Sequence, residues 1–173
     1  MDEIETGLKR QHGFVDFLYW NMVVALPIVT ACIGIFKDSF PWMVFYLIIC
    51  IFLVAVIYRF YCTHCPHYVE GGKTTKCMFF WGMPKFFDAR PGPLNLFEKT
   101  VSFAAPVVLV LIPLYWLILQ PGLLAIYVLS VAVLVTTIRK NECSRCIYFH
   151  CPANCVPEDI KVQEQFYGGA NVP

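Results

Sequence analysis

Four long apolar runs alternate with polar segments along the chain. They cover residues 14–36, 41–60, 101–119 and 121–138. Each is close to the roughly 20 residues that a helix needs to cross the hydrocarbon core of a bilayer. None carries a charged residue in its middle third, and none shows the polar face of a helix in a soluble bundle. The pattern predicts an all-α integral membrane protein with four transmembrane helices.

Composition and charge extend this prediction. The chain is 58% hydrophobic over 173 residues, more apolar surface than a soluble domain of this size can bury. Of its 13 lysines and arginines, only Lys37 lies between the first two runs, and none lies between the last two. By the positive-inside rule, both termini and the central loop are expected in the cytoplasm. The protein is therefore expected in an inner or plasma membrane.

Aromatic residues mark the expected membrane boundaries. The segment at 78–100 is rich in aromatics, contains Gly and Pro, and carries Lys85 and Arg90. This composition is typical of a segment in the headgroup layer, and a lid over the cysteine site is the alternative interpretation. Belt positions near lipid headgroups are expected for Tyr19, Trp20, Tyr58 and Tyr61 on the inner side and for Trp42 and Trp116 on the outer side.

The chain also reads as two copies of one unit. The sequences IYRFYCTHC and IRKNECSRC align without a gap, so that Cys62 matches Cys143 and Cys65 matches Cys146. Pro27 and Pro106 fall in the first run of each copy, where they are expected to bend equivalent helices. Two tandem helical hairpins related by an axis along the membrane normal are predicted. The predicted divisions are a first repeat (1–77), an interfacial segment (78–100), a second repeat (101–155) and a polar cytoplasmic tail (156–173).

Nine cysteines are the most informative feature of the composition. Cys32 and Cys50 lie alone inside apolar runs and are predicted to be packing residues. The other seven fall in two clusters in segments expected to be cytoplasmic. The first cluster contains Cys62, Cys65 and Cys77 with His64 and His67; the second contains Cys143, Cys146, Cys151 and Cys155 with His150.

The spacing within each cluster predicts metal binding. Two cysteines three residues apart can bind one ion as thiolates. The second cluster supplies four sulfur ligands, and the first completes a Cys₃His set with His67, with His64 and His150 as further candidates. Since the cytoplasm is reducing, structural disulfides are a less favoured use of these thiols. One centre per repeat is predicted, and one metal shared by both Cys-x-x-Cys motifs is the alternative.

Thiolate sets of this kind suit both iron–sulfur clusters and zinc. Proline follows Cys65 and Cys151 directly, which loosely resembles the proline beside a ligand cysteine in ferredoxin-type sequences, although the spacing here differs. We therefore favour iron–sulfur, with zinc as the alternative. No haem is expected, because the runs contain no histidine and the chain contains no Cys-x-x-Cys-His sequence.

Other functions lack their usual sequence features. Ion pumps carry ionisable residues within the membrane, and the central parts of these runs have none. The chain also has no phosphate-binding glycine loop and no basic face for nucleic acid. We predict a membrane-anchored electron-transfer subunit, not itself catalytic, between a cytoplasmic protein partner and the membrane or a quinone. A non-enzymatic anchor locked by structural zinc and a thiol-based redox or metal sensor are the alternatives.

Overall fold

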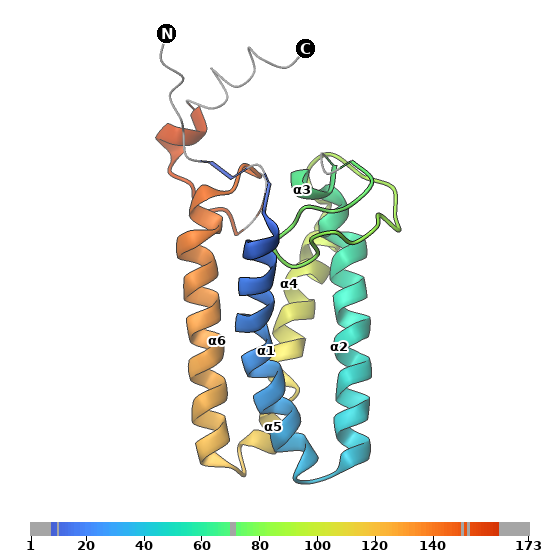
Figure 1. Ribbon diagram of the computed structural model, residues 1–173, viewed down its shortest axis with the longest axis vertical. Coiled ribbons are helices and arrows are strands. Elements are labelled where there is room, and N and C mark those ends of the chain that lie inside the picture. The colour runs from blue at the N-terminus through green and yellow to red at the C-terminus, as the bar shows by residue number, and fades with distance from the viewer. Residues whose placement is uncertain (1–7, 10, 70–71, 150, 152, 163–173) are drawn as a thin grey trace.

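The computed structural model describes residues 8–9, 11–69, 72–149, 151 and 153–162. These residues form an all-helical structure without strands, and four of the helical segments are long and apolar enough to cross a membrane. This confirms the predicted fold class at that level (Figure 1). The elements are α1 (Phe14–Phe36), α2 (Phe40–Phe60), η1 (Cys62–His64), α3 (Pro66–Val69), α4 (Leu96–Leu111), α5 (Leu114–Leu117), α6 (Pro121–Asn141) and η2 (Cys143–Arg145).

The third helix begins earlier than its apolar run. Asn95 caps α4: its side-chain oxygen accepts a hydrogen bond from the Glu98 amide (2.8 Å), and the Glu98 carboxylate accepts one from the Asn95 amide (3.1 Å). This reciprocal pair satisfies amides that a helix start leaves without partners. The expected start at residue 101 was therefore wrong, because the polar first turn of α4 is held by capping and not by hydrophobicity.

The third span is also interrupted. Pro113 has no amide hydrogen and cannot continue the hydrogen-bond ladder, so α4 ends at Leu111 and α5 restarts at Leu114. The hydroxyl of Tyr127 on α6 donates to the Val110 carbonyl at 3.0 Å, near this break. Pro27 and Pro106, by contrast, lie inside α1 and α4 without ending either helix.

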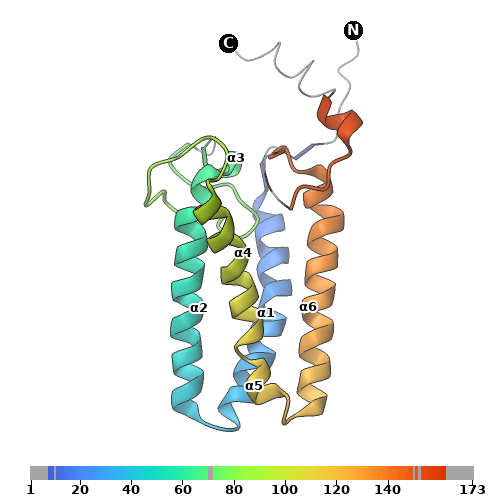
Figure 2. The same cartoon turned by 180° about the vertical axis from the view of Figure 1, so that it is seen from behind.

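The helices pack as a bundle in which α1 lies against α6 and α2 lies against α4, with α1 also touching α2 and α5. The start of α1, the end of α2, the start of α4 and the end of α6 all lie at one end (Figures 1 and 2). We call this the cysteine end, because both Cys-x-x-Cys motifs lie there. The short connections from α1 to α2 and from α5 to α6 lie at the opposite end.

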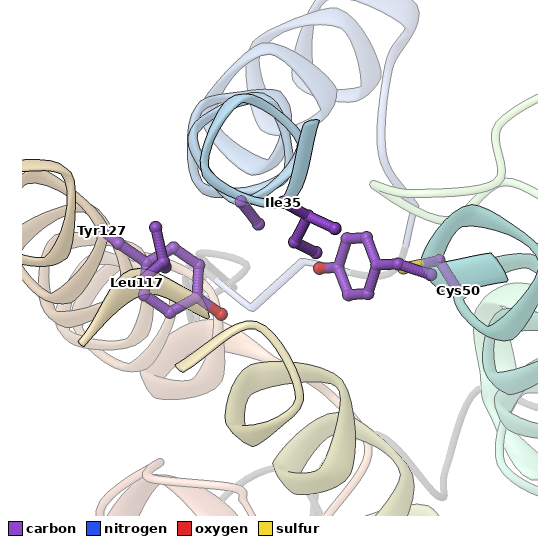
Figure 3. Close-up of a cluster of buried hydrophobic side chains, with 6 residues drawn as sticks. Ile35, Cys50, Leu117 and Tyr127 are labelled. Atoms are coloured by element: carbon purple, nitrogen blue, oxygen red, sulfur yellow. The ribbon is translucent and has the colours of Figure 1, made fainter. Parts of the chain in front are cut away.

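A buried apolar cluster joins the helices (Figure 3). Cys50 lies within it and Cys32 packs against it, as expected for packing residues. Many other large apolar side chains on the helices remain exposed on the surface of the chain, which suits a lipid environment. The buried members of the cluster are Ala31, Ile35, Tyr46, Cys50, Leu117 and Tyr127.

Close approach of α1 and α5 depends on Gly34. A Cβ atom at this position would lie 2.5 Å from Cδ2 of Leu117, whose side chain is fully buried and has little room to move. We expect Gly34→Ala to destabilise the protein by about 1–3 kcal/mol through overpacking. Thermal unfolding in detergent measures this effect. Gly122→Ala is the matched control, because a Cβ there meets nothing within 4 Å. An equal loss in both variants would contradict the assigned packing.

Candidate metal and thiol site

The two Cys-x-x-Cys motifs adopt the same local structure. Each follows the end of a long helix as a single 3₁₀ turn, η1 after α2 and η2 after α6. In the first motif, the Cys65 amide donates to the Cys62 carbonyl at 3.0 Å. The residues that cap the two preceding helices are Tyr61 and Glu142. The aligned sequences thus present their cysteines from equivalent turns at the cysteine end.

Thiols from the two clusters lie near one another. All nine cysteines are free. The Cys65 thiol interacts electrostatically with those of Cys77, Cys146 and Cys151, and the Cys146 thiol interacts with those of Cys77 and Cys151. We call Cys65, Cys77, Cys146 and Cys151 the shared tetrad, because two members come from each cluster.

Backbone amides stabilise negative charge on the sulfurs of the shared tetrad. The Tyr148 amide donates to Cys146 Sγ at 3.5 Å, and the Ala153 amide donates to Cys151 Sγ at 3.4 Å. In each case the amide belongs to the second residue after the cysteine. In the first cluster, the His67 backbone acts to lower the pKa of Cys65, and the backbone of Met78, Phe79 and Phe80 acts to lower the pKa of Cys77. Hydrogen bonds of this kind stabilise a sulfur that carries negative charge.

Burial opposes that charge in the absence of a cation. Burial raises the pKa of the Cys65 thiol well above its usual value, and the neighbouring Cys77 thiol adds to the shift. Burial also raises the pKa of Cys77 and of Cys146. A bound metal cation would reverse this preference, since it deprotonates a coordinating thiol. As placed, no three His, Cys, Asp or Glu side chains among the described residues are arranged to hold a metal ion.

The other sequence candidates lie around the tetrad. Cys62 interacts with Cys65 and Cys77, and Cys143 interacts with Cys146, Cys151 and Cys155. His67 and His64 are both buried, and Nε2 of His64 lies 3.3 Å from the Glu98 carboxylate. His150 lies outside the described residues.

A buried carboxylate beside the cysteines was missed from the sequence. Glu142 accepts hydrogen bonds from Lys9 Nζ (3.1 and 3.3 Å) and from Trp20 Nε1 (3.0 Å). Trp20 is only 1% exposed, so its expected position in a lipid-facing aromatic belt was wrong. The indole instead satisfies a buried carboxylate, as a buried polar group requires. The one available signal was the position of Glu142 directly before Cys143.

His12, the histidine outside both clusters, also folds onto this site. Its Nδ1 lies 3.7 Å from a Glu142 oxygen, and its ring centroid lies 4.7 Å from that of His67. Burial, together with the charge of His67, lowers the pKa of His12 to about 4. His12 is therefore neutral at neutral pH, and Lys9 is the cation that pairs with Glu142.

The N-terminal segment connects the two cysteine segments. The Lys9 amide donates to the Arg145 carbonyl (2.7 Å) and the His12 amide donates to the Lys76 carbonyl (3.2 Å). Arg145 and Lys76 are the direct neighbours of Cys146 and Cys77. The N-terminal segment is thus hydrogen-bonded to a direct neighbour of one tetrad cysteine in each cluster.

Residues of the central loop lie against the first cysteine turn. The Arg90 amide donates to the Thr63 carbonyl at 2.9 Å, and the Tyr68 hydroxyl donates to the Phe87 carbonyl at 2.6 Å. Arg90 also pairs with the buried Glu98 at 2.9 Å. These bonds hold the loop against the turn and the short helix on either side of Cys65.

Tyr61 makes a direct link between the clusters. Its hydroxyl lies 2.7 Å from Cys151 Sγ, although the two residues are 90 positions apart in the sequence. No family model, curated protein or solved structure matches the chain. The site offers soft sulfur ligands, amide donors to sulfur and a nearby buried ion pair.

Proposed function

We propose that the chain is a membrane-anchored electron-transfer subunit whose shared tetrad binds one iron–sulfur cluster. The cluster would pass electrons between a cytoplasmic protein partner and the membrane, where a quinone is the expected acceptor. The membrane anchor is the four-helix bundle. Four thiolates are the usual ligand set of such clusters.

The observation that carries this proposal is that the Cys65 thiol has electrostatic neighbours in both clusters, Cys77 in its own and Cys146 and Cys151 in the other. Backbone amides also donate to the sulfurs of Cys146 and Cys151. Hydrogen bonds to ligand sulfurs and limited exposure to solvent are the features that tune iron–sulfur reduction potentials. The arrangement favours one shared centre over one centre per repeat, because Cys65 has neighbours from both clusters. Metal binding would require the four sulfurs to move together from their present positions.

Reduction of the purified protein tests the redox function. We expect protein prepared without oxygen to be brown, to lose visible absorption on addition of dithionite, and to regain it with a quinone analogue. The reduced form should give an electron paramagnetic resonance signal. A colourless protein that binds zinc alone would contradict electron transfer.

Structural zinc is the second candidate function. It is favoured by the bonds that gather the N-terminal segment and the two cysteine segments around the tetrad, since a structural zinc site contributes directly to folding. In that case the protein is an anchor whose cysteine end is locked by the ion. Chelation would then lower the unfolding temperature without any change in visible absorption.

We propose further that the cysteine end faces the cytoplasm, because the lysines and arginines concentrate in its segments. We expect an Asp38→Cys variant, in the exposed turn between α1 and α2, to react with an impermeant thiol reagent on intact cells. The Glu158→Cys variant should react only after permeabilisation. The reverse pattern would contradict the orientation.

A further inference from the structure

The shared tetrad leaves two thiols of the second cluster close together. The Cys155 amide donates to the Cys143 carbonyl at 3.0 Å, so the two backbones are directly bonded. Their thiols also interact electrostatically. We propose that Cys143 and Cys155 form a reversible dithiol–disulfide site, distinct from the tetrad, that reacts with low-molecular-weight disulfides.

The spacing suits this bond. A backbone hydrogen bond between two residues brings their Cα atoms to a separation comparable with the about 4.4–6.8 Å at which disulfides form. Both cysteines are partly exposed, as an incoming disulfide requires. The two thus combine proximity with access, whereas Cys50 is buried in the apolar cluster.

The surroundings of Cys155 differ from those of the tetrad sulfurs. Its Sγ donates to the Ala153 carbonyl at 3.4 Å and lies 3.8 Å from a guanidinium nitrogen of Arg139. A positive group beside a partly exposed sulfur is the setting of reactive cysteines, because the thiolate is the nucleophile. We therefore assign Cys155 as the attacking residue and Cys143 as the resolving residue.

The reaction balances without a metal. The Cys155 thiolate attacks the added disulfide; an S–S bond forms to Cys155, and the displaced thiolate leaves with the electron pair and takes up a proton. The Cys143 thiolate then attacks Cys155 and releases the second thiol. The two cysteines lose two electrons and two protons in total, and the added disulfide is reduced to two thiols.

Formation of this bond would close the loop that carries Cys146 and Cys151. The state of the dithiol would thereby restrict two members of the tetrad, because a cross-link removes conformational freedom from the segment it closes. The dithiol itself does not depend on the identity of the metal, or on whether one is bound.

Oxidised glutathione is the probe for this site. The full-length protein, purified without oxygen, is incubated with it, alkylated and digested, and its peptides are identified by mass spectrometry. We expect a Cys143–Cys155 cross-link in the wild type and in the Cys32→Ala control. Cys143→Ser should retain glutathione on Cys155, because the resolving thiol is missing. Cys155→Ser should give neither the cross-link nor glutathione on Cys143.

Two results would contradict a dithiol formed by Cys143 and Cys155. A cross-link of Cys143 to Cys151, or no oxidation of Cys143 and Cys155, would overturn the proposal. Folding of both serine variants is checked by comparing their unfolding temperatures with that of the wild type. Should Cys143→Ser not fold, Cys155→Ser together with the wild-type cross-link still decides the assignment.

Discussion

Serine at Cys65 or at Cys146 is expected to abolish metal binding by the whole chain. Serine oxygen is a poor ligand for soft metals, and each substitution removes one of four ligands of a shared centre. The two residues belong to different clusters. Either substitution alone therefore removes all the metal only if both clusters contribute ligands to the same centre. Metal content of each purified variant, measured against the wild type, tests the expectation.

Two further variants complete this test: Cys143→Ser distinguishes a shared centre from a local one, and Cys32→Ala is the control. A shared tetrad retains its metal in the Cys143→Ser variant, whereas a centre made by the second cluster alone loses it. Cys32 packs against the apolar cluster, so its replacement by alanine should leave the metal content unchanged. Retention of metal by Cys65→Ser together with loss from Cys143→Ser would contradict the shared site.

The Glu142→Ala variant is expected to lose about 3 kcal/mol of stability. It removes a carboxylate from a buried ion pair and leaves the indole donor of Trp20 without its partner. The loss of stability is limited because the unpaired Lys9 side chain is 30% exposed, so that water can partly solvate its charge. Unfolding in detergent, followed by intrinsic tryptophan fluorescence and by circular dichroism, measures the loss.

A matched control uses the other type of ion pair in the chain. Glu158 pairs with Lys161 at 2.7 Å, but its side chain is 84% exposed. Glu158→Ala should therefore change stability by no more than about 0.5 kcal/mol. Equal unfolding temperatures for Glu142→Ala and the wild type would show that the buried pair does not hold the cysteine end together.

The helices could be predicted from the sequence because each is set by a local property. Apolar runs of membrane length predict α1 and α2 nearly to the residue. The third span departs from the prediction where other local chemistry takes over, at the Asn95 cap and at the break before Pro113. Capping motifs and prolines can be read from a sequence, but a prediction based only on the length of apolar runs does not use them.

The candidate site was less predictable, because its contacts join distant parts of the chain. The cysteine clusters stand out by composition, yet the approach of Cys65 to Cys146 and Cys151 depends on how the helices pack. Glu142 meets Lys9 and Trp20 across 133 and 122 residues of sequence. His12 carries no motif that links it to His67. Residues of this kind become part of a site only through tertiary structure.

The most direct test of the account is the iron, acid-labile sulfide and zinc content of the wild-type protein, purified without oxygen. The reference is a variant in which Cys65, Cys77, Cys146 and Cys151 are all serine. We expect iron and sulfide in the wild type and neither in the variant. Equal metal content in the two proteins, or zinc without iron in the wild type, would contradict an iron–sulfur centre held by the shared tetrad.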